Sequence, residues 1–223
     1  MNTLQKHYLN LSKEASLPEE HIDYLRFLKD SGIEPKVIYD IGSCVLHWTK
    51  EAEKIWPDAE IILFEANPNC EFLYSAYRYH IGVLSHTSNM NLKFYLNEFS
   101  PGGASYYREI GSPISGLLYP SHRYYKYKTS SLDDIVSSKD FPLPDLIKID
   151  VQGAEMDVLL GGRKTFENAK NLILELPKLN VQYNENAPTA SQTLELVKKM
   201  GWICSNPLFS DNGQYDGDFG FVR

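Results

Sequence analysis

Cysteine is scarce in the 223-residue sequence, and its spacing argues against two kinds of site. The three cysteines, Cys44, Cys70 and Cys204, lie far apart and form no C-x-x-C pair. A structural zinc site usually needs closely spaced Cys or His ligands, and a disulfide framework usually shows an even set of cysteines. We therefore expect no bound metal and no disulfides, which favours a reducing compartment such as the cytoplasm.

Long hydrophobic runs are also missing, and acidic residues outnumber basic ones. No segment approaches the ~20 apolar residues of a membrane-spanning helix, and residues 1–20 lack the apolar stretch of a signal peptide. The chain carries 29 Asp and Glu against 22 Lys and Arg, a net charge of −7, whereas loose binding to nucleic acid phosphates favours a basic protein. We expect a soluble protein with neither a membrane nor a nucleic acid as partner.

What the sequence does contain is enough apolar material for one core. Hydrophobic residues make up 43% of the chain, which fits a single α/β domain with a short extension. Residues 1–35 are typical of a helical N-terminal extension, because Pro18 stands near a helix start, acids follow it, and Gly32 can end the helix. Residues 36–223 form the predicted main domain.

Strand-like apolar runs alternate with helix-like segments from residue 36 to about residue 200. This order predicts an α/β fold with a mostly parallel sheet and helices on both faces. Residues 98–122 contain four glycines and three prolines, which predicts an irregular loop that could form a lid over a ligand. The expected strands are 36–42, 60–66, 81–85, 91–97, 124–130, 146–150, 171–177 and two in the tail; the expected helices include 49–56, 69–80, 132–136 capped by Ser130 or Ser131, 154–169 and 189–201.

Acidic residues stand where several of the predicted strands end. Asp40 and Gly42 close the strand in "VIYDIGS", Glu65 closes "LFE", and Asp150 closes "LIKID". Parallel α/β sheets bind ligands outside the carboxyl ends of their strands, so these side chains are expected to meet there. A glycine lets the backbone approach a ligand, and a glutamate can accept hydrogen bonds from ribose hydroxyls. A plain strand-end turn is the alternative interpretation of Asp40 and Gly42.

Other residues near these strand ends allow more than one interpretation. Lys148 and Asp150 point to one face of the sheet, either as an ion pair beneath a site or with Lys148 extended past the sheet edge. Glu155 falls in the first turn of a helix, where the helix dipole alone favours an acid. Cys44 and His47 stand where the dinucleotide fingerprint G-x-G-x-x-G needs glycines, which argues against a nucleotide-dependent oxidoreductase as an alternative function.

Together these segments resemble the FkbM-type methyltransferases, which use S-adenosylmethionine. The resemblance rests on "VIYDIGS", "LFEANP", "SSLDDIV", "LIKIDVQGAEMDVLLGG" and "LILEL", in that order, and covers about residues 36–177. It implies a Rossmann-like, class I methyltransferase fold with a seven-stranded sheet, so that residues 36–223 become a methyltransferase domain. By position, it implies that Asp40 and Gly42 line the methionine end of the cofactor, that Glu65 holds the ribose, that Asn67 flanks the adenosine, and that Asp150 faces the amino group or the acceptor. Ser43 is a further candidate cofactor-binding residue.

The predicted activity is methyl transfer to a hydroxyl of a sugar or small metabolite, as the resemblance suggests. The candidates for a catalytic base are Asp150, Glu155 and His122. The sequence departs from the family at Cys44, where Asn is common, and at Leu46, where a second Gly is common. Leu46 could crowd the methionine carboxylate, so a non-catalytic, cofactor-binding member of the same fold is the other alternative.

Overall fold

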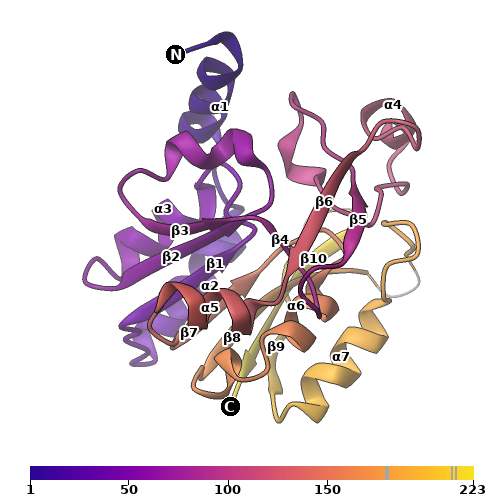
Figure 1. The fold of residues 1–223 in the computed structure, drawn as a ribbon. Helices are drawn as coiled ribbons and strands as arrows, with labels where there is room; N and C mark the ends of the chain where they lie inside the picture. Colours follow the sequence, from indigo (N-terminus) through magenta and orange to yellow (C-terminus); the bar gives the residue numbers. More distant parts are fainter. Residues whose placement is uncertain (179–180, 212, 214) are drawn as a thin grey trace.

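A seven-stranded sheet forms the centre of the computed structural model, which describes all residues except 179, 180, 212 and 214 (Figure 1). Its strands are β1 (Val37–Ile41), β2 (Glu60–Glu65), β3 (Arg78–Ile81), β7 (Leu146–Ile149), β8 (Asn171–Pro177), β9 (Ile203–Asp211) and β10 (Asp216–Val222). The strand order is β3-β2-β1-β7-β8-β10-β9. All neighbours pair in parallel except β10, which is antiparallel to both β8 and β9. The predicted α/β fold with a mostly parallel seven-stranded sheet is confirmed.

Helices cover both faces of this sheet. Those whose side chains share a core with one face are α1 (Thr3–Glu14), α2 (Glu19–Asp30), α3 (His47–Ile55) and the 3-10 helix η1 (Pro68–Leu73). Those on the opposite face are α5 (Leu132–Lys139), α6 (Glu155–Gly161), the 3-10 helix η3 (Thr165–Glu167) and α7 (Ala190–Lys199). The sheet is therefore buried on both sides, which explains why its inner parallel strands, β1, β2, β7 and β8, are mostly apolar in sequence.

Alternation along the central strands decides where the charged residues point. Tyr39 and Ile41 pack in the core on the α5–α7 face, while Ile38 packs in the core on the α1–α3 face. Asp40 lies between Tyr39 and Ile41, so it points toward α3. In the register of β1 with β7, Asp40 is paired with Lys148. The fold thus brings a carboxylate and an ammonium group side by side beneath the carboxyl ends of the strands.

A smaller sheet projects beyond the carboxyl ends of the central strands. Its strands are β4 (Val83–Leu84), β5 (Asn91–Phe94) and β6 (Tyr125–Ser130), in the order β4-β6-β5. Between β5 and β6 the chain is mostly irregular, as predicted for residues 98–122, with only the 3-10 helix η2 (Pro101–Gly103) and the short α4 (Ser115–Leu118). Figure 1 shows α4 at the outer end of β5 and β6.

Two local predictions had different outcomes. Ser131 caps α5, since its side chain accepts a hydrogen bond from the amide of Asp134, as expected. The helix predicted over residues 69–80 is wrong. The Asn67 side chain caps η1, which ends at Leu73, and residues 78–81 form β3 at the sheet edge.

The N-terminal helices are packed against the rest of the chain. Tyr8 of α1 and Leu25 of α2 are fully buried in the same core as Ile38 of β1 and Trp48 of α3. The predicted helical character of residues 1–35 is confirmed, while the domain division at residues 35 and 36 stays a prediction. Across the described part of the chain, no helix combines the length and apolarity needed to cross a bilayer.

Candidate functional site

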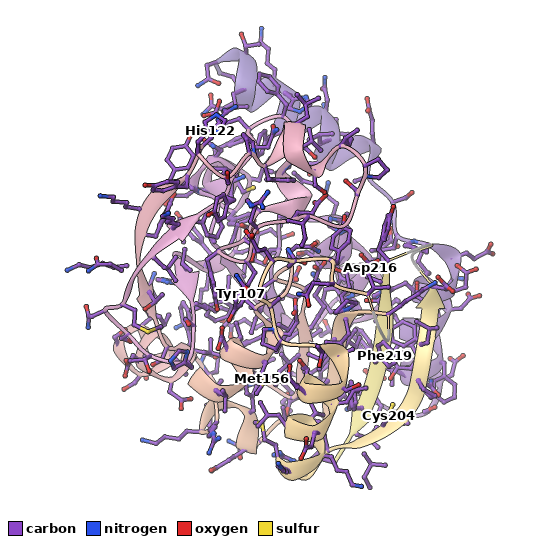
Figure 2. The ribbon with its side chains drawn as sticks, turned by 90° about the vertical axis from the view of Figure 1, so that its right-hand side faces the viewer. Tyr107, His122, Met156, Cys204, Asp216 and Phe219 are labelled. Atoms are coloured by element: carbon purple, nitrogen blue, oxygen red, sulfur yellow. The ribbon has the colours of Figure 1, made fainter. Side chains whose placement is uncertain are left out.

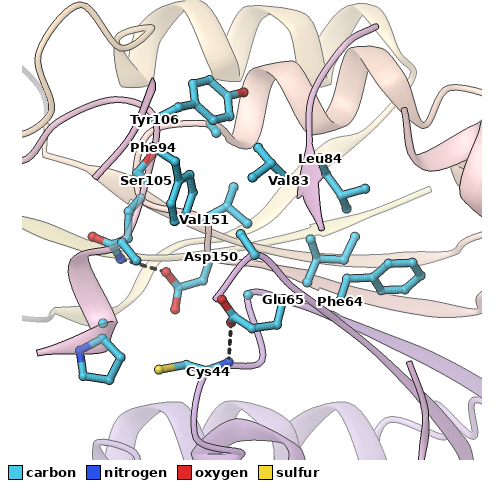
Figure 3. A pocket seen from close by; sticks show the side chains of 18 of the residues that line it. Cys44, Phe64, Glu65, Val83, Leu84, Phe94, Ser105, Tyr106, Asp150 and Val151 are labelled. Carbon is cyan, nitrogen blue, oxygen red and sulfur yellow. Dashed lines mark hydrogen bonds between the residues drawn. The ribbon is translucent and has the colours of Figure 1, made fainter. Parts of the chain in front are cut away.

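A cavity of about 220 Å³ opens where β1, β2, β4 and β7 end (Figure 3). The carboxylates of Glu65 and Asp150 both point into it, above the backbone at Cys44. The segment before α4 contributes Pro101, Gly102, Ala104, Ser105 and Tyr106 to its wall. The other lining residues are Ile41, Gly42, His47, Phe64, Ala66, Gly82, Val83, Leu84, Phe94, Val151, Gln152 and Ala154. The cavity therefore combines apolar walls with two acids.

Glu65 is held by the backbone at the end of β2. Its Oε2 accepts a hydrogen bond from the amide of Cys44 and its Oε1 accepts one from the amide of Asn67, both at 2.8 Å. Burial raises the pKa of this carboxyl, and the hydrogen bonds from the two backbone amides oppose that shift. Each carboxylate oxygen has two lone pairs, so both oxygens can still accept a hydrogen bond from a hydroxyl group of a ligand.

Lys148 lies beneath the cavity and joins two of the predicted acids. Its Nζ atom is 3.2 Å from Oδ2 of Asp150 and 3.4 Å from Oδ1 of Asp40. Lys148 is 3% exposed, so the ion pair is buried and the alternative of an extended lysine is wrong. Oδ2 of Asp40 also accepts a hydrogen bond from Thr49 of α3 at 2.6 Å. Asp40 is therefore below the cavity wall and reaches it only through Lys148.

This network keeps Lys148 and Asp150 charged. Burial alone would lower the pKa of Lys148, but the carboxylates of Asp150 and Asp40 hold that pKa above its ordinary value. Burial would likewise raise the pKa of Asp150, yet the Lys148 ammonium holds it below the usual range. A carboxyl with so low a pKa is a weak proton acceptor, although it remains a strong partner for a cation.

Gly42 makes the tight turn that leads from β1 toward α3. Its φ angle is +88°, and a β-carbon added to it would lie 1.7 Å from the carbonyl oxygen of Asp150. Its amide donates to the carbonyl oxygen of Phe64 at 2.8 Å, and its own carbonyl oxygen accepts from Lys148 at 3.2 Å. Glycine is required here by the packing of two strand ends as well as by the approach to the cavity.

Two polar residues of this site were missed from the sequence. The Nε2 atom of Gln152 donates to Oδ1 of Asp150 at 2.8 Å and to Oε2 of Glu175 at 2.7 Å. Burial and the neighbouring Asp150 charge raise the pKa of Glu175 well above its usual value. Glu175 ends an apolar run, "NLILE", in the same way as Glu65, and that pattern could have identified it.

Glu155 has a role in its own loop and lies outside the main cavity. Its Oε1 accepts hydrogen bonds from the amides of Val151 and Gly153, at 3.0 and 3.1 Å. The side chain is buried, and burial raises its pKa to about 7. It contributes to a smaller depression beside the cavity, together with Gln152 and Glu175. The structure thus supports its predicted place at the start of α6 but does not place it at the cavity wall.

Three other predicted site residues also lie off the cavity wall. Ser43 is buried and donates to the carbonyl oxygen of Asp40 at 2.6 Å. Asn67 is buried, and its Nδ2 donates to the hydroxyl of Tyr8 at 2.9 Å. His122 is exposed on the segment between α4 and β6, at the top of Figure 2. Ser43 and Asn67 shape the turns that carry Glu65 and Gly42, whereas His122 is remote from both.

The two departures from the family pattern have different consequences. Leu46 adopts the left-handed conformation, with φ +70°, at the residue that precedes α3, which is why a glycine would suit this position. Its side chain is buried in the core with α2 and α3 and does not line the cavity. Cys44 does line it and presents its amide to Glu65. Leu46 therefore leaves the cavity open.

The wall opposite the strand ends is fixed by one carboxylate. Tyr106 and Tyr107 both donate their hydroxyl protons to Oδ2 of Asp157 on α6, each at 2.8 Å. Oδ1 of Asp157 lies 3.3 Å from Nδ1 of His86. Asp157 thus anchors the segment that covers the cavity, although nothing in its sequence pattern set it apart from a solvated helix residue.

Comparison of this geometry with solved structures identifies related folds. A methyltransferase FkbM from Methylobacillus flagellatus is 12% identical, with a TM-score of 0.51, and the match covers 100% of this chain and 56% of that one. The O-methyltransferase TomG from Streptomyces achromogenes, solved in complex with S-adenosylmethionine, is 10% identical, with a TM-score of 0.51, and the match covers 100% and 90% of the two chains. At such identities the likeness shows the fold alone.

Comparison of the sequence with known families identifies the family of this chain. Comparison with curated proteins gives no significant match. The methyltransferase FkbM domain matches residues 37–203, which include every strand of the central sheet up to the start of β9 and all of the cavity lining. S-adenosylmethionine is the cofactor of this family, and a cavity with two acids and apolar walls suits a ligand that carries positive charge and an adenosine group. The chain belongs to the FkbM methyltransferase family.

Proposed function

We propose that this protein transfers the methyl group of S-adenosylmethionine to a hydroxyl group of a sugar or small metabolite. The observation that carries the proposal is the pair of carboxylates, Glu65 and Asp150, that enter one cavity at the carboxyl ends of β2 and β7, the strands on either side of β1. Sheets of this type bind their ligands at that edge. When bound there, S-adenosylmethionine would supply a methyl group activated by its attachment to a sulfonium centre.

Each wall of the cavity has a distinct task in this proposal. Glu65 accepts hydrogen bonds from the ribose hydroxyls. The Cys44 and Asn67 amides hold its two oxygens in place, and each oxygen retains a free lone pair. Asp150 stays ionised beside Lys148 and attracts the ammonium or sulfonium charge. Phe94 and Tyr106 close the far side, which excludes water and restricts the acceptor to one approach.

Calorimetric titration with S-adenosylmethionine, or with its demethylated product, tests the cofactor site. We expect binding by the wild type and a loss of more than about 30-fold in affinity for Glu65→Ala, since charged hydrogen bonds are lost. Glu60→Ala is the matched control, because Glu60 lies at the exposed start of the same strand. Ala66→Leu, which narrows the cavity and keeps Glu65, should also weaken binding if the ligand occupies this space.

Methyl transfer itself is checked by mass spectrometry on a panel of sugars and small hydroxyl compounds. Addition of one methyl group to a hydroxyl, dependent on Glu65, is the expected result. No affinity at millimolar cofactor would contradict the cofactor site. Tight binding with no transfer to any hydroxyl, amine or thiol acceptor would instead favour the non-catalytic alternative.

A further inference from the structure

The small sheet and the segment between β5 and β6 have a charge opposite to that of the whole chain. Residues 86–132 contain five Lys and Arg against two acids, Glu98 and Glu109, although the protein carries a net charge of −7. Four of these cations are Lys93 on β5, Arg123 before β6, and Lys126 and Lys128 on β6, and all four are exposed. Within the described residues none of the four forms an ion pair. This end of the molecule is therefore a basic surface.

The strand register concentrates these charges. Lys93 is directly opposite Lys126 in the antiparallel pair of β5 and β6, and like charges in that position repel each other. Lys128 is two residues from Lys126, so it points to the same face at a spacing of roughly 7 Å. The Lys93 ammonium lies 4.6 Å from the centre of the Tyr124 ring and covers one face of it. An external anionic surface would relieve the repulsion.

Exposed apolar side chains are concentrated in the chain between β5 and the first residue of β6. Ten large hydrophobic side chains are exposed among the described residues, and five of them lie between residues 99 and 125. Leu117 of α4 is 80% exposed and Phe99 is 70% exposed, and the other three are Ile110, Ile114 and Tyr125. Because α4 sits at the outer end of β5 and β6, one flat partner could meet the apolar and the basic groups together (Figure 1).

From this combination we propose that the end of the protein formed by α4, β5 and β6 docks on the surface of an anionic lipid bilayer. Basic side chains supply attraction to acidic headgroups, and exposed Leu, Ile and Phe side chains enter the interfacial region. A free polyanion would use the lysines but would leave Leu117 and Phe99 in water. The earlier expectation of no membrane partner rested on the missing spanning segment, and surface contact needs none.

Docking in this way has a consequence for the cavity. The cavity wall at Pro101, Gly102 and Tyr106 belongs to the same irregular segment as Phe99, Ile110 and Leu117. Contact with a bilayer would therefore place that wall near the headgroups. The inference itself rests on the exposed surface alone and holds whether or not the methyl transfer proposal does.

Co-sedimentation with vesicles is the test. The wild type should sediment with phosphatidylcholine vesicles that contain about one third phosphatidylglycerol at low salt, and should not sediment with pure phosphatidylcholine, because attraction to the headgroups is electrostatic. Adding about 0.5 M salt should release it through screening. No sedimentation with the anionic vesicles at low salt would overturn the proposal.

Matched variants distinguish an effect of this basic surface from an effect of the protein's net charge. Lys126→Glu with Lys128→Glu should lower the vesicle partition coefficient more than about tenfold. Lys198→Glu with Lys199→Glu changes the net charge equally at the far end of α7 and should have little effect. Equal losses in the two double variants would overturn the proposal.

The apolar contribution needs its own pair of variants. Leu117→Ser should weaken partitioning about tenfold, whereas Ile203→Ser, at a site on β9 that is 68% exposed, should not. If Leu117→Ser has no effect while dextran sulfate competes fully for the lysines, the surface binds a soluble polyanion and the bilayer proposal is wrong. All of these residues are exposed, so circular dichroism and thermal melting should match those of the wild type.

Discussion

The β-carbon position of Gly42 lies 1.7 Å from the carbonyl oxygen of Asp150, so the turn after β1 and the end of β7 are packed as closely as backbone allows. Any side chain at residue 42 must move one strand end away from the other. The positive φ of Gly42 adds a second penalty for an L-residue. Because Asp150 supplies one of the two carboxylates in the cavity, this contact links the geometry of the turn to the proposed cofactor site.

We expect Gly42→Ala to lower the free energy of unfolding by roughly 3 kcal/mol or more, since the clash is with backbone that cannot rotate away. Urea unfolding followed by circular dichroism measures the change. Gly116→Ala is the control, because nothing lies within 4 Å of its added β-carbon. Its effect should stay within about 1 kcal/mol. Equal stabilities for the two variants would show that the turn is free to relax.

Lys148→Met should destabilise the protein by about 3–5 kcal/mol, because it leaves the Asp40 and Asp150 carboxylates without their shared buried counter-charge. Adding Asp40→Asn to that variant should recover part of the loss, since one uncompensated charge is removed. Chemical denaturation of the single and double variants checks both statements.

Lys199→Met serves as the control for the lysine change. Lys199 pairs with Glu195 on the exposed face of α7, and such pairs are worth at most about 1 kcal/mol. A Lys148→Met variant as stable as Lys199→Met would mean that the buried network contributes nothing net.

Glu155 should make stability depend on pH in a predictable direction. Burial raises its pKa from 4.5 to about 7, so between these values the folded protein binds more protons than the unfolded chain. The contribution of Glu155 to the free energy of unfolding is then complete below pH 4.5. It decreases by up to about 3 kcal/mol as the pH rises toward about 7. The raised pKa of Glu175 contributes with the same sign.

The Glu155→Gln variant isolates this effect. Its unfolding free energy, measured in urea between about pH 5 and pH 7.5, should decrease less steeply than that of the wild type. Glu167→Gln, at an exposed position of η3, should give a curve parallel to that of the wild type. A parallel curve for Glu155→Gln as well would rule out proton uptake at this residue.

Asp157→Ala should loosen the segment that covers the cavity. The change removes the acceptor of the Tyr106 and Tyr107 hydroxyls, and each hydrogen bond to a charged group contributes about 1.5 kcal/mol or more. Amide hydrogen exchange in residues 101–107 should become more than about tenfold faster, while exchange in β1 and β2 should be unchanged. Asp58→Ala, at an exposed turn before β2, is the control. Unchanged exchange near Tyr106 would contradict the anchoring role of Asp157.

Much of the fold could be predicted from local patterns because strands buried on both faces are continuously apolar. β1, β2, β7 and β8, the Ser131 cap and the end of α7 near Gly201 all follow such patterns. β3 could not be found in this way. Its residues "RYHI" are mostly polar, and they form a strand because β2 offers them an open edge, with Ile62 in register with Arg78.

The candidate site shows the same division. Glu65 and Asp150 were found because an acid at the end of an apolar strand is costly unless it has partners. Asp40 follows the same rule, yet only the register of β1 with β7 reveals that Lys148 takes up its charge and keeps it below the cavity. Tyr106 and Asp157 meet across 51 residues, a relationship that depends on tertiary packing.

The hydrogen bond from Asn67 to the hydroxyl of Tyr8 has a consequence for how much of the chain the site requires. The backbone amide of Asn67 also donates a hydrogen bond to Glu65, the acid proposed to bind the ribose. Tyr8 of the first helix therefore supports Glu65 through one residue, Asn67. A protein shortened to begin at residue 37 would retain the whole family match and still lose that brace, along with the buried rings of Tyr8 and Tyr24. The first thirty-six residues thus help to position Glu65, the acid proposed to bind the ribose.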